Sequence, residues 1–404
     1  MRLSLVAILT AIISLYFSFL DKGLNYKTMK DQNRSSYSCV TLFLCGDVMT
    51  GRGLDQILPN PVNPWIYEPY VKDARDYVRL AEKKNGPINK PVSYSYIWGD
   101  AIEVWEQIAP ALKIINLETS ITSHNLPWPG KGINYRMDPK NIEVLTSAGI
   151  DFCSLANNHT LDWGQEGLLE TLQTLRDADI AYAGAGIDLS EACRPAQLKI
   201  GQSKVIIFAS GSITSGVPKS WIATSKSCGL NLLNVEDDEY LNNISRQVKS
   251  INQAGDIVVF SVHWGSNWGY DIPDSHRNFA HWLIDSSGVD IVYGHSSHHP
   301  RGIEVYKDKL ILYGAGDFIN DYEGISGYEQ YRDDLTLMYF PSIDTSNGNL
   351  VSMIMVPMQI KNFRLNHASV SDANWLFNIL NREGGKLGTG ITLNEKRYFS
   401  LNWD

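Results

Sequence analysis

The chain has 404 residues, 44% hydrophobic and 20% charged, so it is long enough for one large domain or two ordinary ones and too apolar to be disordered. Its formal net charge of −9 argues against nucleic acid as a partner, and an anionic substrate would need local positive charge. The five cysteines include no CxxC pair, which argues against a disulfide scaffold and favours buried, reduced thiols.

The N-terminus carries a nearly continuous apolar run over residues 3–20. Its length is borderline for crossing a bilayer, and it also resembles the apolar part of a signal peptide. We therefore expect residues 1–38 to be an anchor or export signal followed by a polar linker. The alternative is that translation starts at Met29, which would leave the protein in the cytoplasm.

Strand and helix patterns alternate after this segment. Strands are predicted over 40–44, 113–117, 151–155, 180–183, 205–210, 256–262 and 289–293. Helices are predicted over 67–84, 100–108, 138–149, 165–178, 236–253 and 274–286. Such alternation indicates a mainly parallel sheet that is covered by helices.

The pattern changes after residue 300. Predicted strands follow one another with no helix between them, over 303–306, 310–313, 335–340 and 350–360. A helix is predicted over 375–381, with a glycine-rich tail after it. We expect these late strands to form a second, more antiparallel sheet packed on the first. Segments 123–137 and 211–234 are predicted loops that could cover a site.

Five groups of polar residues stand where predicted strands end. They are Cys45-Gly46-Asp47-Val48-Met49, Asn116-Leu117-Glu118, Asn157-Asn158-His159, Val262-His263-Trp264-Gly265 and Gly294-His295-Ser296-Ser297-His298. Carboxylate, amide and imidazole groups are ligands of divalent metals. Because the carboxyl ends of parallel strands meet at one edge of a sheet, the sequence predicts a metal centre there.

Each motif taken alone also has a structural explanation. Asp47 could cap a helix or a turn, Asn157 and Asn158 could form an ordinary turn, and His263 could be a hydrogen-bonded interior histidine. The clustered histidines at 295–299 are harder to explain in this way. Taken together, the five strand-end motifs favour the metal centre.

The combination of motifs resembles the CapA family of poly-γ-glutamate capsule biosynthesis proteins. The resemblance covers about residues 40–320 and includes Arg52, Asp162, Gly164 and the run 302–306. That family resembles calcineurin-like metallophosphatases. The resemblance implies the α/β fold class, as a four-layer α/β/β/α sandwich of the metallo-dependent phosphatase-like type. We expect this domain over 39–365, with 366–404 as a C-terminal extension packed on it.

The resemblance also implies two divalent ions, of manganese, zinc or iron, and a role for each motif. The expected ligands are Asp47 and His298 for one metal, Asn158, His263 and His295 for the other, and Glu118 as the bridge. His159 is the candidate proton donor or oxyanion contact, because it neighbours a ligand and histidine titrates near neutrality. Met49 stands where the phosphatases have a histidine, so the first metal needs another ligand such as Asp317.

We therefore expect a metal-dependent hydrolase of a phosphoester or of a γ-glutamyl amide. Arg52 or Arg136 would hold an anionic group of the substrate. The alternative is a non-catalytic component that binds or exports an anionic polymer, next to a membrane-bound polymer synthetase. A cytosolic enzyme of an unrelated pathway is a third alternative, favoured by a start at Met29.

Overall fold

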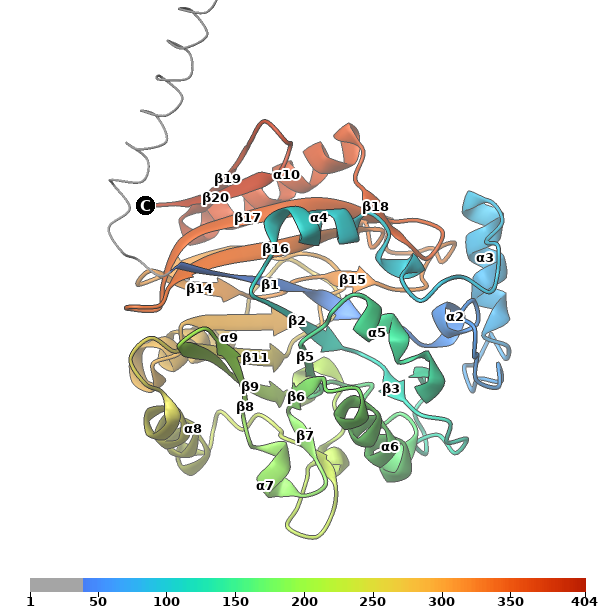
Figure 1. Cartoon of the computed structure of the whole chain (residues 1–404), viewed down its shortest axis with the longest axis horizontal. Coiled ribbons are helices and arrows are strands. Elements are labelled where there is room, and N and C mark those ends of the chain that lie inside the picture. The colour runs from blue at the N-terminus through green and yellow to red at the C-terminus, as the bar shows by residue number, and fades with distance from the viewer. Residues whose placement is uncertain (1–38) are drawn as a thin grey trace, which may run out of the picture. The chain divides into compact units, whose positions relative to one another are not determined.

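The computed structural model describes residues 39–404, and two β-sheets form the centre of this part of the chain (Figure 1). Along its main path the first sheet contains β19 (Thr389–Leu393), β20 (Phe399–Trp403), β17 (Asn349–Ile360), β16 (Leu335–Asp344), β1 (Cys39–Val48), β2 (Leu112–Leu117), β5 (Phe152–Ser154) and β6 (Ala181–Ala183). In addition, β15 (Asp317–Ile319) pairs with β1, and β18 (Leu365–His367) pairs with β17.

The second sheet is smaller. Its strands, in order, are β13 (Ile303–Tyr306), β14 (Lys309–Leu312), β12 (Ile291–His295), β11 (Ile257–His263), β9 (Ser203–Gly211) and β8 (Ala196–Ile200). Short two-stranded pairs join β3 (Ser120–Ile121) to β4 (Arg136–Met137), and β7 (Ala185–Gly186) to β10 (Gly229–Leu230). The predicted hairpin at 303–313 is confirmed, since β13 and β14 are antiparallel.

Helices cover the outer faces of both sheets. Those that contribute apolar side chains over the first sheet are α3 (Arg75–Asn85), α4 (Ala101–Ile108), α5 (Glu143–Ser147) and α6 (Gly164–Asp177). Over the second sheet lie α8 (Asp238–Ile251) and α9 (Asp274–Trp282), the latter continued by a π-helical turn over Leu283–Ser287. The remaining helices are α2 (Arg52–Asp55), α7 (Leu189–Ala192) and α10 (Val370–Gly384), which packs against β13, β17 and β19.

Three separate apolar cores show why the chain forms four layers. Along β1, Phe43 and Cys45 face the helices, whereas Leu42 and Leu44 face the second sheet, as the two-residue period of a strand requires. A third core lies between the second sheet and α8 and α9. Helix, sheet, sheet and helix are thus separated by three buried apolar interfaces, and the predicted four-layer fold is confirmed.

Two sequence predictions of secondary structure are wrong. The helix expected over 67–84 begins only at Arg75, because the preceding segment pairs Trp65 with Asp73 in a short bridge and directs Glu68 inward toward Arg52. The expected glycine-rich tail contains a real hairpin, β19 and β20, which extends the first sheet through β17. Both errors lie away from the strand ends that carry the predicted site.

Strand register places the predicted site residues in line. Asp47 pairs with Asn116 of β2 and with Asp317 of β15, while His263 of β11 pairs with His295 of β12. A register irregularity between Leu44 and Asp47 bends the end of β1. Gly46 lies there because an added Cβ would stand 1.9 Å from the carbonyl oxygen of Gly316.

Residues 39–404 form one compact unit, which includes the expected C-terminal extension. Among these residues the longest apolar helices are too short or too polar to cross a bilayer. The apolar segment predicted as an anchor lies in residues 1–38, outside the described residues. The five cysteines are unpaired, and Cys45, Cys153 and Cys228 are buried as expected, whereas Cys39 is exposed.

Candidate metal centre

Three carboxylates are buried together at the ends of β1, β2 and β15. Asp47, Glu118 and Asp317 are each at most 3% exposed, so they are almost fully removed from water. Asp47 accepts hydrogen bonds from Asn116 Nδ2 at 2.7 Å and from the Ser296 amide at 3.2 Å. These two neutral donors do not compensate the negative charge of a carboxylate that is buried beside two others.

Two buried histidines approach the carboxylates from the second sheet. The Ser261 hydroxyl donates to Ser154 Oγ, so His295 Nε2 donates to Ser261 Oγ at 2.8 Å and its Nδ1 is unprotonated. That Nδ1 lies 3.9 Å from Asp47 Oδ1 and 2.8 Å from His263 Nδ1. His263 Nδ1 therefore carries the proton, and His263 Nε2 is left with a lone pair.

The lone pair of His263 Nε2 faces other acceptors. Asn158 Oδ1 lies 3.0 Å from it, and Glu118 Oε1 lies 3.9 Å from it. An imidazole lone pair, an amide oxygen and a carboxylate oxygen repel one another unless a cation lies between them. These nitrogen and oxygen donors fit a divalent metal ion such as zinc, manganese or iron.

Interatomic distances define two ligand groups that share Asp47. Single ligand atoms of Asp47, His263 and His295 all lie within 4.8 Å of one another, and the same holds for Asp47, His298 and Asp317. Asp317, which the sequence offered only as an extra ligand, thus belongs to the second group. The expected bridging role of Glu118 stays a prediction, since Asp47 is the residue common to both groups.

His298 is held by polar partners on both sides of its ring. Its Nδ1 donates to Asp317 Oδ1 at 2.8 Å, and its Nε2 accepts from Asn267 Nδ2 at 3.0 Å. Asp317 Oδ2 accepts in turn from Asn320 Nδ2 at 2.7 Å. Although burial opposes it, the carboxylates of Asp317 and Asp47 raise the pKa of His298.

Burial shifts the pKa values of four groups toward their neutral forms, namely Asp47, Glu118, His263 and His295. It raises the pKa of Asp47 to about 7, with a further contribution from Asp317, and it raises the pKa of Glu118 well above its usual range. It also lowers the pKa of His295 to about 3 and that of His263 well below its usual range. The neutral imidazoles are ready to bind a cation, whereas Asp47 and Glu118 must give up a proton when one binds.

His159 stands beside this cluster with its ring fixed by Asp162. Its Nδ1 donates to Asp162 Oδ2 at 2.6 Å, its ring stacks on Tyr135 with centroids 4.0 Å apart, and its Nε2 lies 3.7 Å from Glu118 Oε1. Burial lowers the pKa of His159 to about 4. The sequence analysis expected titration near neutrality, whereas this lowered pKa leaves Nε2 facing the cluster as an acceptor at pH 7; the role of His159 as proton donor stays a prediction.

The two predicted substrate-binding arginines are buried and have internal partners. Arg52 binds Glu68 and Asp321, and its guanidinium lies 3.7 Å from the centre of the Tyr77 ring. Arg136 lies over the Trp163 ring at 3.8 Å and donates to backbone carbonyls. Substrate binding by either arginine stays a prediction, and the contacts favour a structural role for both.

A cavity of about 420 Å³ opens next to the candidate metal centre. Its lining residues are Lys131, Gly132, Ile133, Tyr135, Asn158, His159, Asn267, His298 and Tyr322. The predicted loop over 123–137 therefore forms one wall. The second predicted loop, over 211–234, contacts the centre through Ser215, whose hydroxyl donates to the carbonyl of His263 at 3.0 Å.

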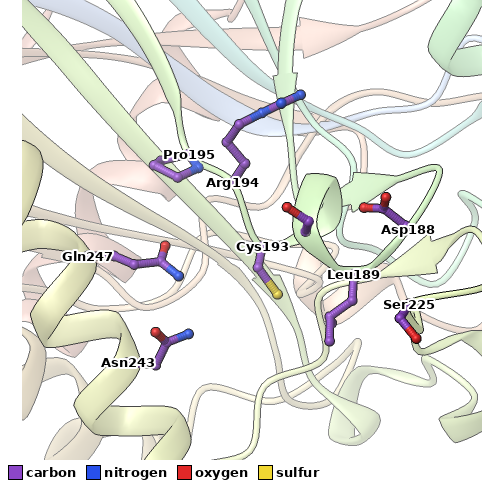
Figure 2. A pocket seen from close by; sticks show the side chains of 9 residues that line it. Asp188, Leu189, Cys193, Arg194, Pro195, Ser225, Asn243 and Gln247 are labelled. Carbon is purple, nitrogen blue, oxygen red and sulfur yellow. The ribbon is translucent and has the colours of Figure 1, made fainter.

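A larger cavity of about 600 Å³ lies elsewhere, between α7 and α8 (Figure 2). Cys193, Asn243 and Gln247 line it, whereas the predicted metal ligands are not among its lining residues. Its one permanent cation among the described residues, Arg194, is exposed and lies 3.3 Å from Glu191. Charge and ligand chemistry, rather than volume, therefore make the smaller cavity the candidate functional site.

Comparison with known proteins identifies the family of this chain. Residues 41–322, which carry every predicted ligand, match the family described as bacterial capsule synthesis protein PGA_cap. The chain belongs to the PGA_cap family. A probable polyglutamine synthesis accessory protein of Mycobacterium tuberculosis is 45% identical over 354 residues, which are 87% of this chain and 93% of that protein.

Two further relatives of this PGA_cap member carry capsule-related names. The capsule biosynthesis protein CapA of Bacillus anthracis is 24% identical over 325 residues, 80% of this chain and 68% of that protein. The PGA biosynthesis protein CapA of Bacillus subtilis is 30% identical over 227 residues, 55% of this chain and 56% of that protein. The predicted resemblance to the CapA family is therefore confirmed.

Sequence reasoning gave no role to several residues that support the centre. Asn116 orients Asp47, Ser261 sets the tautomer of His295, and Asp162 fixes His159. Asn116 and Asp162 lie inside or just after the predicted motifs, so their positions were visible in the sequence. Ser261 and Lys131 gave no such signal, because their partners are distant in the chain.

Proposed function

We propose that this chain is a metal-dependent hydrolase that cleaves γ-glutamyl amide bonds during the synthesis of a glutamyl polymer. The observation that carries the proposal is the convergence of three acceptors: Asn158 Oδ1 and Glu118 Oε1 both lie within 4 Å of His263 Nε2. This group lies beside a cavity and beside a histidine that is fixed by a carboxylate.

Metal ions at such a site would supply Lewis-acid activation of the substrate carbonyl and of the attacking water. The residues that would hold them are Asp47, Glu118, Asn158, His263, His295, His298 and Asp317. Asp47 and the neutral imidazoles of His263 and His295 are present in both the predicted ligand set and the observed groups.

His159 would move the proton. At neutral pH its Nδ1–H is committed to Asp162, so Nε2 accepts the proton that the attacking water releases. As the bond from water oxygen to carbonyl carbon forms and the carbon–nitrogen bond breaks, Nε2 passes this proton to the leaving nitrogen. This mechanism makes His159 first a base and then an acid, in place of the proton donor that the sequence suggested.

The names of the relatives support the choice of a glutamyl polymer over a phosphoester. One relative is called a probable polyglutamine synthesis accessory protein, and others are called capsule or PGA biosynthesis proteins. We propose that the partners are an anionic glutamyl polymer and a membrane-bound polymer synthetase. Attachment to the membrane, or export, through residues 1–28 is part of the same proposal.

The proposal is tested by following the release of amino groups from γ-linked glutamyl oligomers. The full-length protein is loaded with manganese, zinc or iron and compared with His159→Gln, which should keep its metal and lose about 10²–10⁴-fold in kcat. His281→Gln is the matched control, because His281 pairs with Glu304 away from the cavity. Metal binding and polymer binding without any turnover would instead support the alternative of a non-catalytic polymer-binding component.

A further inference from the structure

Lys131 is the one residue with a permanent positive charge among those that line the 420 Å³ cavity in the described part of the chain. It lies on the loop over 123–137, and its side chain is 15% exposed, so the ammonium reaches the cavity without being free in solvent. Arg52 and Arg136 are buried behind the cavity wall with partners of their own. Lys131 is therefore the cation that a bound ligand would meet first.

The hydrogen bonds of Lys131 leave one donor unused. An ammonium group has three N–H donors. One contacts Asp162 Oδ1, and one donates to the carbonyl of Ile133 at 3.0 Å. The third neighbour, His159 Nδ1 at 3.1 Å, cannot accept, because that nitrogen already donates to Asp162. One N–H of Lys131 is thus available to a ligand beside His159.

A second donor faces the same cavity. The hydroxyls of Tyr135 and Tyr322 are 3.1 Å apart, and both residues line the cavity. Of their two O–H protons only one is used between them, which leaves the other for a ligand oxygen. Burial raises the pKa of Tyr322 well above its usual range, so this hydroxyl stays a donor. An ammonium and a phenol together suit an anionic oxygen group.

We infer that Lys131 binds the carboxylate next to the leaving nitrogen of the substrate and selects γ-linked glutamyl chains. This inference rests on the proposed function. In a γ-linked chain, the nitrogen of the amide that is cut is attached to the carbon that carries the free α-carboxylate. Lys131 lies beside the His159 ring, whose Nε2 serves that nitrogen, so its ammonium is within reach of this carboxylate. In a phosphoester the anionic oxygens are on the reacting atom itself and would face the metal ligands instead.

The experiment compares two substrates that differ only in this charge. The full-length, metal-loaded protein is given γ-glutamyl-glutamate and the same dipeptide with the α-carboxylate of its second residue converted to an amide. Lys131→Met should raise KM for the free carboxylate by about ten- to hundredfold and change KM for the amide less than about twofold. Lys131→Arg should restore part of the loss. Lys226→Met, an exposed lysine on another loop, is the control.

Equal losses on both substrates would overturn the inference, since they would mean that Lys131 acts only through Asp162 and His159. If the wild type cleaves neither dipeptide, the proposed function fails, and calorimetric binding then tests Lys131 separately. The inference would be supported if Lys131→Met weakened binding of the free-carboxylate dipeptide but not binding of the amide. The carboxylate assignment would be overturned if Lys131→Met weakened binding of inorganic phosphate and left binding of the dipeptide unchanged.

Discussion

Two groups of buried charges lie near Tyr135 and Tyr322, and they differ in how their charge is compensated. The first, the Arg52 cluster, consists of Arg52, Glu68, Asp321 and the hydroxyl of Tyr77. Arg52 Nη1 donates to Glu68 Oε1 at 2.8 Å, Arg52 Nε donates to Asp321 Oδ2 at 2.9 Å, and the Tyr77 hydroxyl donates to Glu68. Each carboxylate therefore has a cationic donor from the protein itself.

The second group, the carboxylate cluster, consists of Asp47, Glu118 and Asp317. The Asn116 amide donates to Asp47, whereas His263 Nε2 and Asn158 Oδ1 present lone pairs to the cluster. Among the described residues, His298 is the titratable base that contacts one of these carboxylates most closely, at Asp317. Burial of charge requires compensation, and in this cluster we expect a bound cation to supply it. The comparison thus assigns a structural role to the Arg52 cluster and a binding role to the carboxylate cluster.

Replacing Asp47 should give the largest effect, because Asp47 belongs to both ligand groups. In Asp47→Asn we expect the metal content to fall from about two ions per chain to nearly none. Elemental analysis of the folded protein after incubation with manganese, zinc or iron measures this.

Asp55→Asn is the matched control for that measurement. Burial raises the pKa of Asp55 to about 7 as well, but the Val62 and Asp138 amides and Asn141 Nδ2 donate to it. Its replacement should leave the metal content unchanged. Equal metal content in Asp47→Asn and wild type would remove the distinction between the two clusters.

Replacing Arg52 should mainly affect stability. In Arg52→Met the carboxylates of Glu68 and Asp321 remain buried without their cation, which we expect to lower the free energy of unfolding by about 3–5 kcal/mol. Urea denaturation measures the change. Arg75→Met is the control, because the Arg75–Asp73 pair is exposed, and its midpoint should hardly move.

Metal content and substrate binding of folded Arg52→Met decide whether Arg52 is structural or binds substrate. A structural Arg52 cluster predicts that the remaining folded protein binds as much metal as the wild type. A stable Arg52→Met protein with weakened substrate binding would instead restore the substrate-binding role that the sequence suggested.

Ser261→Ala should have a smaller effect that is confined to the carboxylate cluster. Without the Ser261 hydroxyl, His295 Nε2 loses its acceptor, and the tautomer that leaves Nδ1 unprotonated is no longer favoured. We expect a loss of about 10–100-fold in metal affinity, measured by calorimetry. Ser215→Ala is the control, because Ser215 contacts only the backbone carbonyl of His263 and of Ser212. Equal losses in both variants would argue against a tautomer effect.

The same contrast explains what could be predicted from sequence. Asp47, Glu118 and His263 follow apolar runs of strand-forming residues, so their convergence at a sheet edge follows from the parallel alternation alone. The partners of Arg52 lie 16 and 269 residues away in the chain. The sequence analysis could not detect them and therefore expected Arg52 to bind an anionic substrate. An ion pair between distant residues has no local pattern.

The helix expected over 67–84 failed for a related reason. Tyr70, Ala74 and Tyr77 have helical spacing, but tertiary contacts of the segment before Arg75 override it, because Glu68 is drawn to Arg52. The role of Lys131 was hidden in the same way, since its neighbours Asp162 and His159 come from another motif. The convergence of candidate ligands at strand ends could thus be predicted, whereas the residues that orient them could not.

The smallest expected effect is a dependence of metal binding on pH. Because the pKa of Asp47 is raised to about 7, its carboxyl is protonated below pH 7 in the metal-free protein and must lose that proton to bind a cation. Metal affinity should therefore fall about tenfold per pH unit below pH 7 and level off above it. Calorimetric titrations between pH 5.5 and 8.5, roughly the range that brackets this pKa, measure the slope.

Stability gives an independent check with a definite sign. A raised carboxyl pKa in the folded state contributes stability below the unfolded value near 3.8, which is lost as pH rises through about 7. The metal-free protein should thus lose stability toward neutral pH, while metal binding grows stronger, so the difference in Tm between the two forms should widen. Asp47→Asn should flatten this dependence, and an unchanged pH profile in that variant would mean that another group, such as Glu118, governs proton release from the carboxylate cluster.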